Sequence, residues 1–141
     1  MDVKLKNIFQ IEGKVIVITG AAGLLGIRHA EAIATFGGTP ILLDLSLDKV
    51  QSYADELNKR FDVNAIGMSV DITDEQQIKD NVHKLISRYG KIDGLETSLV
   101  LSSVHHDQMV SEQYLLHCFL PNPKQVAQFH EQCCHGLHLP Q

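Results

Sequence analysis

One apolar run that leads directly into a spaced set of glycines constrains the fold of this chain more than any other feature. The segment VIVITGAAGLLG covers residues 15–26, and its glycines are Gly20, Gly23 and Gly26. A buried strand, a glycine-rich turn and a helix, in this order, form a binding loop for phosphate groups. Gly20 allows a sharp turn, Gly23 a close approach of pyrophosphate, and Gly26 tight packing of the helix. The segment predicts a dinucleotide-binding loop, and a tight turn without a ligand is the alternative.

Strand and helix patterns alternate through the first two thirds of the chain. The apolar runs have the length of buried strands, and helical patterns separate them. Strands that alternate with helices predict a parallel sheet with helices packed on its faces. The predicted strands are 14–19, 40–45 and 63–72, the last with Ala65 to Val70 at its centre, and a fourth strand starts at 91–95. The predicted helices run from about Leu24 to Phe36, from Ser46 to Phe61 and from Thr73 to Gly90.

Local signals mark the ends and the buried faces of these helices. Gly37-Gly38 and Gly90 end the first and third helices, and Ser46 is a candidate cap for the second. Thr73 and Gln76 match a capping box at the start of the third helix. Each later helix has one apolar stripe that predicts its buried face. The stripes are Val50, Tyr53, Ala54, Leu57 and Phe61 in the second helix, and Ile78, Val82, Leu85, Ile86 and Tyr89 in the third.

An acidic residue stands where the second strand ends. Asp44 follows Gly26 by 18 residues, and an acid at that place accepts hydrogen bonds from both ribose hydroxyls and repels a 2′-phosphate. The loop has no Lys or Arg at Ala21, Ala22 or Leu24. NAD is therefore favoured over NADP. The alternative for Asp44 is a solvated acid that merely precedes a helix.

Four segments together resemble the N-terminal half of the short-chain dehydrogenases/reductases. They are GKVIVITGAAGLLG, the acid in LLDLS, SVDITDEQQI and YGKIDGL, and the resemblance covers about residues 10–95. It implies an α/β fold with a Rossmann-like, doubly wound parallel sheet in strand order 3-2-1-4, truncated after the fourth strand. It also implies NAD(H) binding by Gly20, Gly23, Leu25 and Gly26 at the pyrophosphate, Asp44 at the ribose, and Asp71 and Ile72 at the adenine. A cap before the next helix is an equal alternative for Asp71.

The sequence departs from the family pattern in three ways. Leu24 stands where the commonest spacing has Gly, although a Thr-Gly-x-x-Gly-x-x-Gly variant occurs in the wider family. The family then continues with Val-Asn-Asn-Ala-Gly, whereas residues 96–100 read ETSLV. Its chemistry also needs a Tyr with a Lys four residues later, but Leu, Asp and Cys follow Tyr53, Tyr89 and Tyr114 at that spacing. We therefore assign no catalytic residue and expect the chain alone to be inactive.

Residues 96–141 differ in composition from the residues before them. They hold six of the eight histidines and one Lys, and they end in FHEQCCHGLHLPQ. That spacing fits no zinc motif, so we expect no metal site. We divide the chain into a dinucleotide-binding half-domain at 1–95 and an irregular or short-helical tail at 96–141. The simplest account is a truncated or out-of-frame product, and a separately encoded C-terminal half is the alternative.

Composition and charge exclude several kinds of partner. The net charge of -5 and the absence of a basic stripe argue against nucleic-acid binding. No segment approaches the roughly 20 apolar residues of a membrane span, and residues 1–14 lack an apolar signal region, so we expect a cytoplasmic protein. An exposed edge on the fourth strand favours self-association. The sequence thus predicts an NAD(H)-binding oxidoreductase by family, and a non-catalytic nucleotide-binding or interaction module is the alternative.

Overall fold

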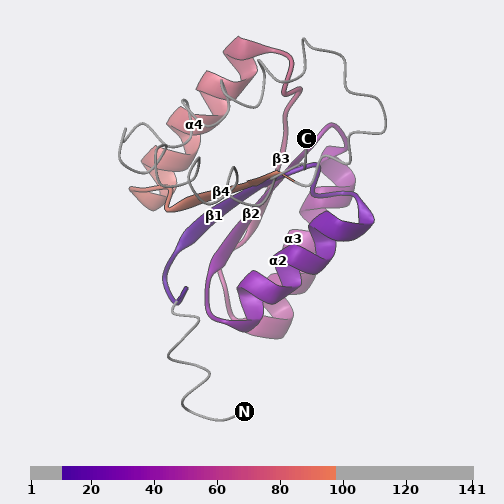
Figure 1. The fold of residues 1–141 in the computed structure, drawn as a ribbon, viewed down its shortest axis with the longest axis vertical. Helices are drawn as coiled ribbons and strands as arrows, with labels where there is room; N and C mark the ends of the chain where they lie inside the picture. Colours follow the sequence, from indigo (N-terminus) through magenta and orange to yellow (C-terminus); the bar gives the residue numbers. More distant parts are fainter. Residues whose placement is uncertain (1–10, 98–141) are drawn as a thin grey trace, which may run out of the picture.

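A four-stranded parallel sheet forms the centre of the molecule (Figure 1). The structure is a computed structural model that describes residues 11–97. The strand order β3-β2-β1-β4 confirms the order that the family resemblance implied. The strands are β1 (Val15–Thr19), β2 (Thr39–Asp44), β3 (Ile66–Ser69) and β4 (Gly94–Thr97), and the helices are α2 (Leu24–Thr35), α3 (Leu47–Phe61) and α4 (Glu75–Tyr89).

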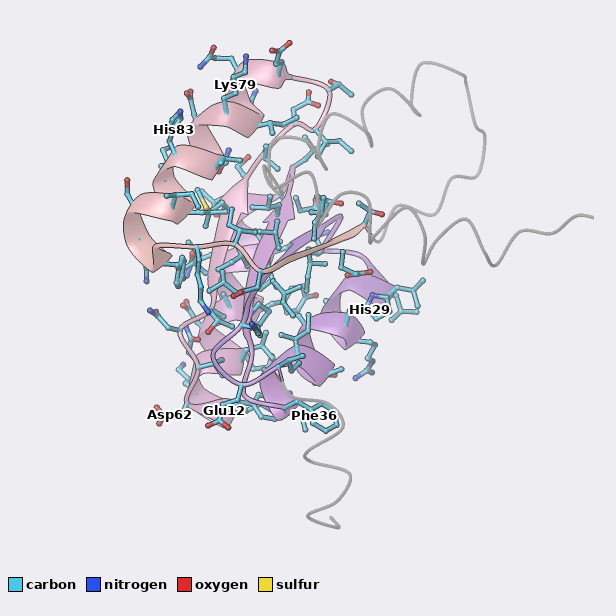
Figure 2. The ribbon with its side chains drawn as sticks, turned by 60° about the vertical axis from the view of Figure 1, so that its left-hand side comes forward. Glu12, His29, Phe36, Asp62, Lys79 and His83 are labelled. Atoms are coloured by element: carbon cyan, nitrogen blue, oxygen red, sulfur yellow. The ribbon has the colours of Figure 1, made fainter. Side chains whose placement is uncertain are left out.

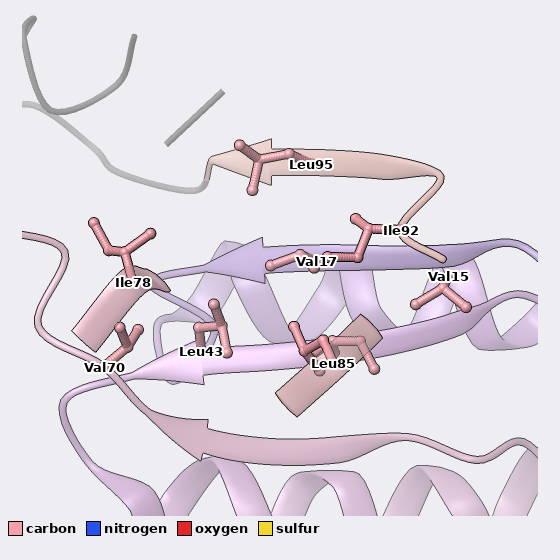
Figure 3. Close-up of a cluster of buried hydrophobic side chains, with 9 residues drawn as sticks. Val15, Val17, Leu43, Val70, Ile78, Leu85, Ile92 and Leu95 are labelled. Carbon is pink, nitrogen blue, oxygen red and sulfur yellow. The ribbon is translucent and has the colours of Figure 1, made fainter. Parts of the chain in front are cut away.

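Helices cover both faces of the sheet, so the fold is doubly wound. α2 and α3 lie on one face and α4 lies on the other (Figure 1). Val17 belongs to the core beneath α4, which Figure 3 shows, while its neighbour Ile18 belongs to the core beneath α2 and α3. Successive residues of a strand point to opposite faces. The uninterrupted apolar run of β1 therefore fills two cores at once, which is why it shows no polar alternation.

β3 is much shorter than predicted, and β4 continues past the predicted boundary of the half-domain. β3 covers only Ile66–Ser69 of the predicted 63–72. The side chain of Asn58 explains its late start, because its Oδ1 accepts the Ala65 N–H at 2.7 Å and its Nδ2 donates to the Ala65 carbonyl at 2.9 Å. Contacts with α3 thus replace ladder bonds before β3. β4 runs to Thr97 and so crosses position 95, where we placed the end of the half-domain.

The cap of α3 is at the predicted residue, whereas the predicted cap of α4 is wrong. Ser46 occupies the N-cap position of α3, but its side chain makes no capping hydrogen bond. The cap of α4 is Asp74, whose Oδ1 accepts the N–H groups of Gln76 and Gln77 at 3.0 and 3.2 Å. Thr73 instead donates its hydroxyl to Asp71. A carboxylate displaces the hydroxyl as cap because it is a charged acceptor at the positive end of a helix.

The buried face of α4 is confirmed with one exception. Ile78 and Leu85 are buried as predicted, but Ile86 is 42% exposed. Ile86 follows Leu85 on a helix, so it is turned away from the sheet by about 100°. The polar residue Asn81 is buried in its place on this face, and its Nδ2 donates to the Gln77 carbonyl at 2.8 Å. The stripe of α3 agrees with the prediction, with Val50, Ala54 and Leu57 buried and Tyr53 and Phe61 packed against them.

The structure describes only part of the chain on which we made predictions. The histidine- and cysteine-rich segment and Tyr114 lie outside the described residues. Among residues 11–97, no helix is long and apolar enough to span a bilayer. Within the same residues, no three His, Cys, Asp or Glu side chains gather where they could hold a metal ion.

Candidate nucleotide-binding site

The loops that follow β1, β2 and β3 meet at the carboxyl edge of the sheet. Open α/β sheets bind their ligands at this edge. The Ala21 N–H donates to the Leu43 carbonyl at 3.0 Å, and the Val70 N–H donates to the Asp44 carbonyl at 3.0 Å. These main-chain bonds hold the loops after β1 and β3 against the end of β2.

The three glycines of the loop differ in what they do for the fold. Gly20 has a φ of 66°, which a side chain disfavours. A Cβ on Gly26 would lie 2.6 Å from the Cα of Ala21, so α2 packs directly on the turn. A Cβ on Gly23 would meet one atom, the Gly20 carbonyl oxygen at 3.3 Å. The fold itself therefore needs Gly20 and Gly26, whereas Gly23 leaves the backbone open to a ligand.

α2 begins without a capping side chain. Its N-cap residue is Gly23, and its first turn contains no acidic residue. α4 differs, because Asp74 caps it and Glu75 lies in its first turn. The N-terminus of a helix carries a partial positive charge and free N–H groups. The start of α2 is therefore suited to an external anion such as a phosphate.

Asp44 contacts the glycine loop directly. Its Oδ2 accepts the Ala22 N–H at 3.1 Å, and its Oδ1 accepts the Ser46 N–H at 3.3 Å. The side chain is half-buried at the end of β2. The structure thus brings the predicted ribose acceptor to the loop predicted to hold the pyrophosphate. This bond joins residues 22 positions apart in the chain, so Asp44 is tied to the glycine loop as well as to the helix that it precedes.

Asp71 and Ile72 lie at the end of the neighbouring strand, β3. Hydrogen bonds from the hydroxyl and the N–H of Thr73, at 2.6 and 2.9 Å, lower the pKa of Asp71. The Asp71 N–H donates to the side chain of Gln77 at 3.0 Å. Ile72 is half-buried against the core beneath α4. In this structure Asp71 therefore shapes the turn that leads into α4, whose cap is Asp74.

Exposed leucines flank this edge, and sequence reasoning missed three of the four. Leu25 was among the predicted residues and is 51% exposed, and Leu24 beside it is 78% exposed. Leu45 and Leu47, on either side of Ser46, are 72% and 47% exposed. Their signal in the sequence is a large apolar residue directly after Gly23 or Asp44. Apolar surface left in water beside a binding loop favours contact with an apolar part of a ligand.

Two polar features near β4 were also not predicted. Thr19 is fully buried, and its hydroxyl has no hydrogen-bond partner among the described residues. Thr97 lies opposite Thr19 in the sheet. His29 on α2 is exposed (Figure 2), and its Nδ1 lies 2.6 Å from Oε1 of Glu96 in β4. This pair joins α2 to the strand at which the family pattern is lost.

The fold and its glycine loop define a Rossmann-like α/β protein. A family model described as short chain dehydrogenase matches residues 14–123, and the chain belongs to that family. The match confirms the resemblance that the sequence motifs indicated. It also extends beyond residue 95, into the part of the chain that we assigned to the tail.

Individual relatives agree with the family assignment. The chain is 37% identical over 89 residues to 3-oxoacyl-(acyl-carrier-protein) reductase FabG of Thermotoga maritima. This alignment covers 61% of this chain and 35% of that protein. It is 30% identical over 84 residues to human 15-hydroxyprostaglandin dehydrogenase (NAD+), and this alignment covers 59% of this chain and 32% of that protein. The chain thus spans about a third of the length of these relatives.

A solved structure gives the same result for the fold. The NADPH-dependent 3-quinuclidinone reductase of Rhodotorula rubra superposes with a TM-score of 0.61 at 30% sequence identity. The superposition covers 67% of this chain and 36% of that chain. The Rossmann-like sheet is therefore shared with short-chain oxidoreductases of known structure.

Proposed function

We propose that this chain binds NAD(H) and is the cofactor-binding part of a short-chain oxidoreductase. The observation that carries the proposal is the bond from the Ala22 N–H to the Asp44 carboxylate. It places an anionic acceptor beside a loop that opens onto an uncapped helix N-terminus. A dinucleotide requires this combination, because its pyrophosphate needs N–H donors and its ribose needs an acceptor.

Each predicted residue has a proposed role in this complex. The pyrophosphate lies against the glycine loop, the adenosine ribose against the end of β2, and the adenine against the end of β3. The residues are Gly20, Gly23, Leu25 and Gly26 for the pyrophosphate, Asp44 for the ribose, and Asp71 and Ile72 for the adenine. The Asp71 bonds to Thr73 leave its Oδ2 available to the adenine edge.

The charges near the loop support NAD rather than NADP. The relatives include an enzyme named for NAD+ and one named for NADPH, so the family alone does not choose. Asp44 would repel a 2′-phosphate, and the loop offers no cation to bind it. The next basic residue along the chain, Arg28, donates to Glu31 at 2.8 Å.

The proposed role is binding and orientation of the cofactor. When bound, NAD supplies a hydride acceptor. The chain contains no Tyr with a Lys four residues later, so we propose that it has no turnover on its own. We assign binding to the sheet and loops of the half-domain, which β4 extends to Thr97. Cytoplasmic location, absence of nucleic-acid partners and self-association through the edge of β4 stay predictions.

Titration calorimetry of the full chain with NAD+ and NADP+ tests the proposal. We expect NAD+ to bind more tightly. Asp44→Ala should weaken NAD+ binding at least about tenfold, through loss of charge-assisted hydrogen bonds. It should also reduce the ratio of the affinity for NAD+ to the affinity for NADP+. Asp48→Ala is the matched control, since Asp48 is an exposed acid on α3. No heat and no thermal shift at millimolar NAD+ would contradict the proposal.

A second assay separates a binding module from an enzyme. Production of NADH is followed by absorbance with a panel of alcohols and the purified chain. We expect no turnover, because general acid–base catalysis needs a positioned proton acceptor. Turnover that persists through purification and disappears in Gly20→Asp would show that the chain is an enzyme by itself.

A further inference from the structure

Asp44 is bonded to all three loops at the carboxyl edge. Its side chain accepts the Ala22 N–H from the loop after β1 and the Ser46 N–H at the start of α3. Its main-chain carbonyl accepts the Val70 N–H from the end of β3. A residue with ribose as its only role would need none of these contacts.

The glycine loop has few other means of holding its shape. Ala21 is anchored by its bond to the Leu43 carbonyl, and the Gly23 N–H donates back to the Gly20 carbonyl at 3.1 Å. The residues of the turn have no side chain longer than a methyl group. Ala22 lies between these points, and its N–H is held by the Asp44 carboxylate. Loss of that acceptor would leave a half-buried donor unsatisfied, which favours reorientation of the peptide.

We infer that Asp44 positions the glycine loop for pyrophosphate, in addition to receiving the ribose. The inference rests on the proposed function and deepens it. Asp44 is a positioning residue for the phosphates, since it acts through the Ala22 peptide.

The two roles are compatible in one carboxylate. An ionised carboxylate offers about four acceptor sites on its two oxygens. The bonds from Ala22 and Ser46 occupy one site on each oxygen. The two sites that remain match the two hydroxyls of a ribose. The same bonds prevent the carboxylate from turning away, so a 2′-phosphate would meet a fixed negative charge.

Inorganic pyrophosphate distinguishes the positioning role from a ribose-only role, because it contains no ribose. Removal of a negative charge near an anion site should by itself strengthen pyrophosphate binding. Loss of loop positioning should weaken it. We expect Asp44→Ala to bind pyrophosphate about tenfold more weakly than the wild-type chain, as measured by calorimetry. Asp44→Asn keeps an oxygen for the Ala22 N–H without the charge, and it should bind at least as tightly as wild type.

Amide hydrogen exchange followed by NMR tests the anchor without a ligand. The Ala22 amide should exchange about tenfold faster in Asp44→Ala and near the wild-type rate in Asp44→Asn and in the control Asp48→Ala. Protection of the Val17 amide in β1 shows that each variant is folded.

Two results separate this inference from the proposed function. A chain that binds NAD+, but whose Asp44→Ala variant keeps both its pyrophosphate affinity and its Ala22 protection, overturns the positioning role alone. A wild-type chain that binds no NAD+ overturns the proposed function. Faster Ala22 exchange in Asp44→Ala would still support the anchoring of the loop in that case.

Discussion

The junctions after β2 and after β3 both carry acidic residues, but they use them differently. At the end of β2, Asp44 accepts a hydrogen bond from Ala22, 22 residues away in the chain. At the end of β3, the side chains of Asp71 and Asp74 accept hydrogen bonds from residues two or three positions later. The first junction joins two loops, and the second builds the start of one helix.

Both junctions lie beside a neighbouring loop, so the position of the strand alone does not explain the difference. β2 lies between β1 and β3, so the loop after β1 is within reach of its carboxyl end. The end of β3 contacts the loop after β2 through the Val70 N–H and the Ser69 hydroxyl, which donate to the carbonyls of Asp44 and Leu45. The acids after β3 differ because their side chains bond to the turn and the first residues of α4 instead.

The largest expected effect comes from Gly26→Val, which would displace the glycine loop that Asp44 contacts. The new side chain would meet the backbone of Ala21 and Gly20, which cannot move without displacing the loop. We expect a loss of about 3 kcal/mol in the free energy of unfolding, measured with urea. Gly94→Ala is the control, since its Cβ would lie 3.7 Å from Ile16 in ordinary contact. Equal urea midpoints for the two variants would contradict the packing argument.

The comparison of the two junctions is sharpened by Asp71→Ala. Because Asp71 bonds mainly to its own turn, its removal should reduce NAD+ affinity by no more than about threefold, compared with at least tenfold for Asp44→Ala. Calorimetry on both variants measures the ratio. Equal losses would show that Asp71 contributes to the cofactor as strongly as Asp44 does.

Asp74→Ala tests the local role of the second junction. Loss of the helix cap should lower Tm by about 4 °C and leave NAD+ affinity unchanged. Thr73→Ala should lower Tm less, since the Thr73 hydroxyl donates to Asp71 and not to α4. Thermal unfolding followed by circular dichroism measures both. A larger decrease in Tm for Thr73→Ala than for Asp74→Ala would support the capping box predicted from the sequence.

The smallest expected effect is a pH dependence at the start of α4. Hydrogen bonds from the N–H and side chain of Gln77 lower the pKa of Asp74, and those from Thr73 lower the pKa of Asp71. A lowered pKa stabilises the fold above the ordinary aspartate pKa of about 4, and this stabilisation is lost as pH falls further. Asp74→Asn should therefore lose less stability than wild type between pH 7 and pH 3, by urea unfolding. Equal losses of stability in Asp74→Asn and in the wild type over this pH range would rule out this contribution of Asp74.

Much of the fold, and the geometry of Gly20 and Gly26 in the candidate site, could be predicted from the sequence, because their signals are local. The apolar runs and the glycines after the first and third helices depend on residues within a few positions of one another, and Gly37 and Gly90 do follow α2 and α4 with positive φ. The strand order came from the family motifs, and Gly20 and Gly26 have the backbone geometry that their spacing predicted.

Tertiary structure determined which residues far apart in the sequence make contact. The cap of α4 was determined by competition between two neighbouring side chains. The bond from Ala22 to Asp44 and the pair of His29 and Glu96, 67 residues apart, exist because packing sets the distance between neighbouring strands and helices. Asp74 rather than Thr73 caps α4, although both have suitable side chains, because a charged acceptor is favoured at the positive end of a helix. Sequence alone determines which residues can form such bonds. The packed sheet determines which of them lie within hydrogen-bonding distance.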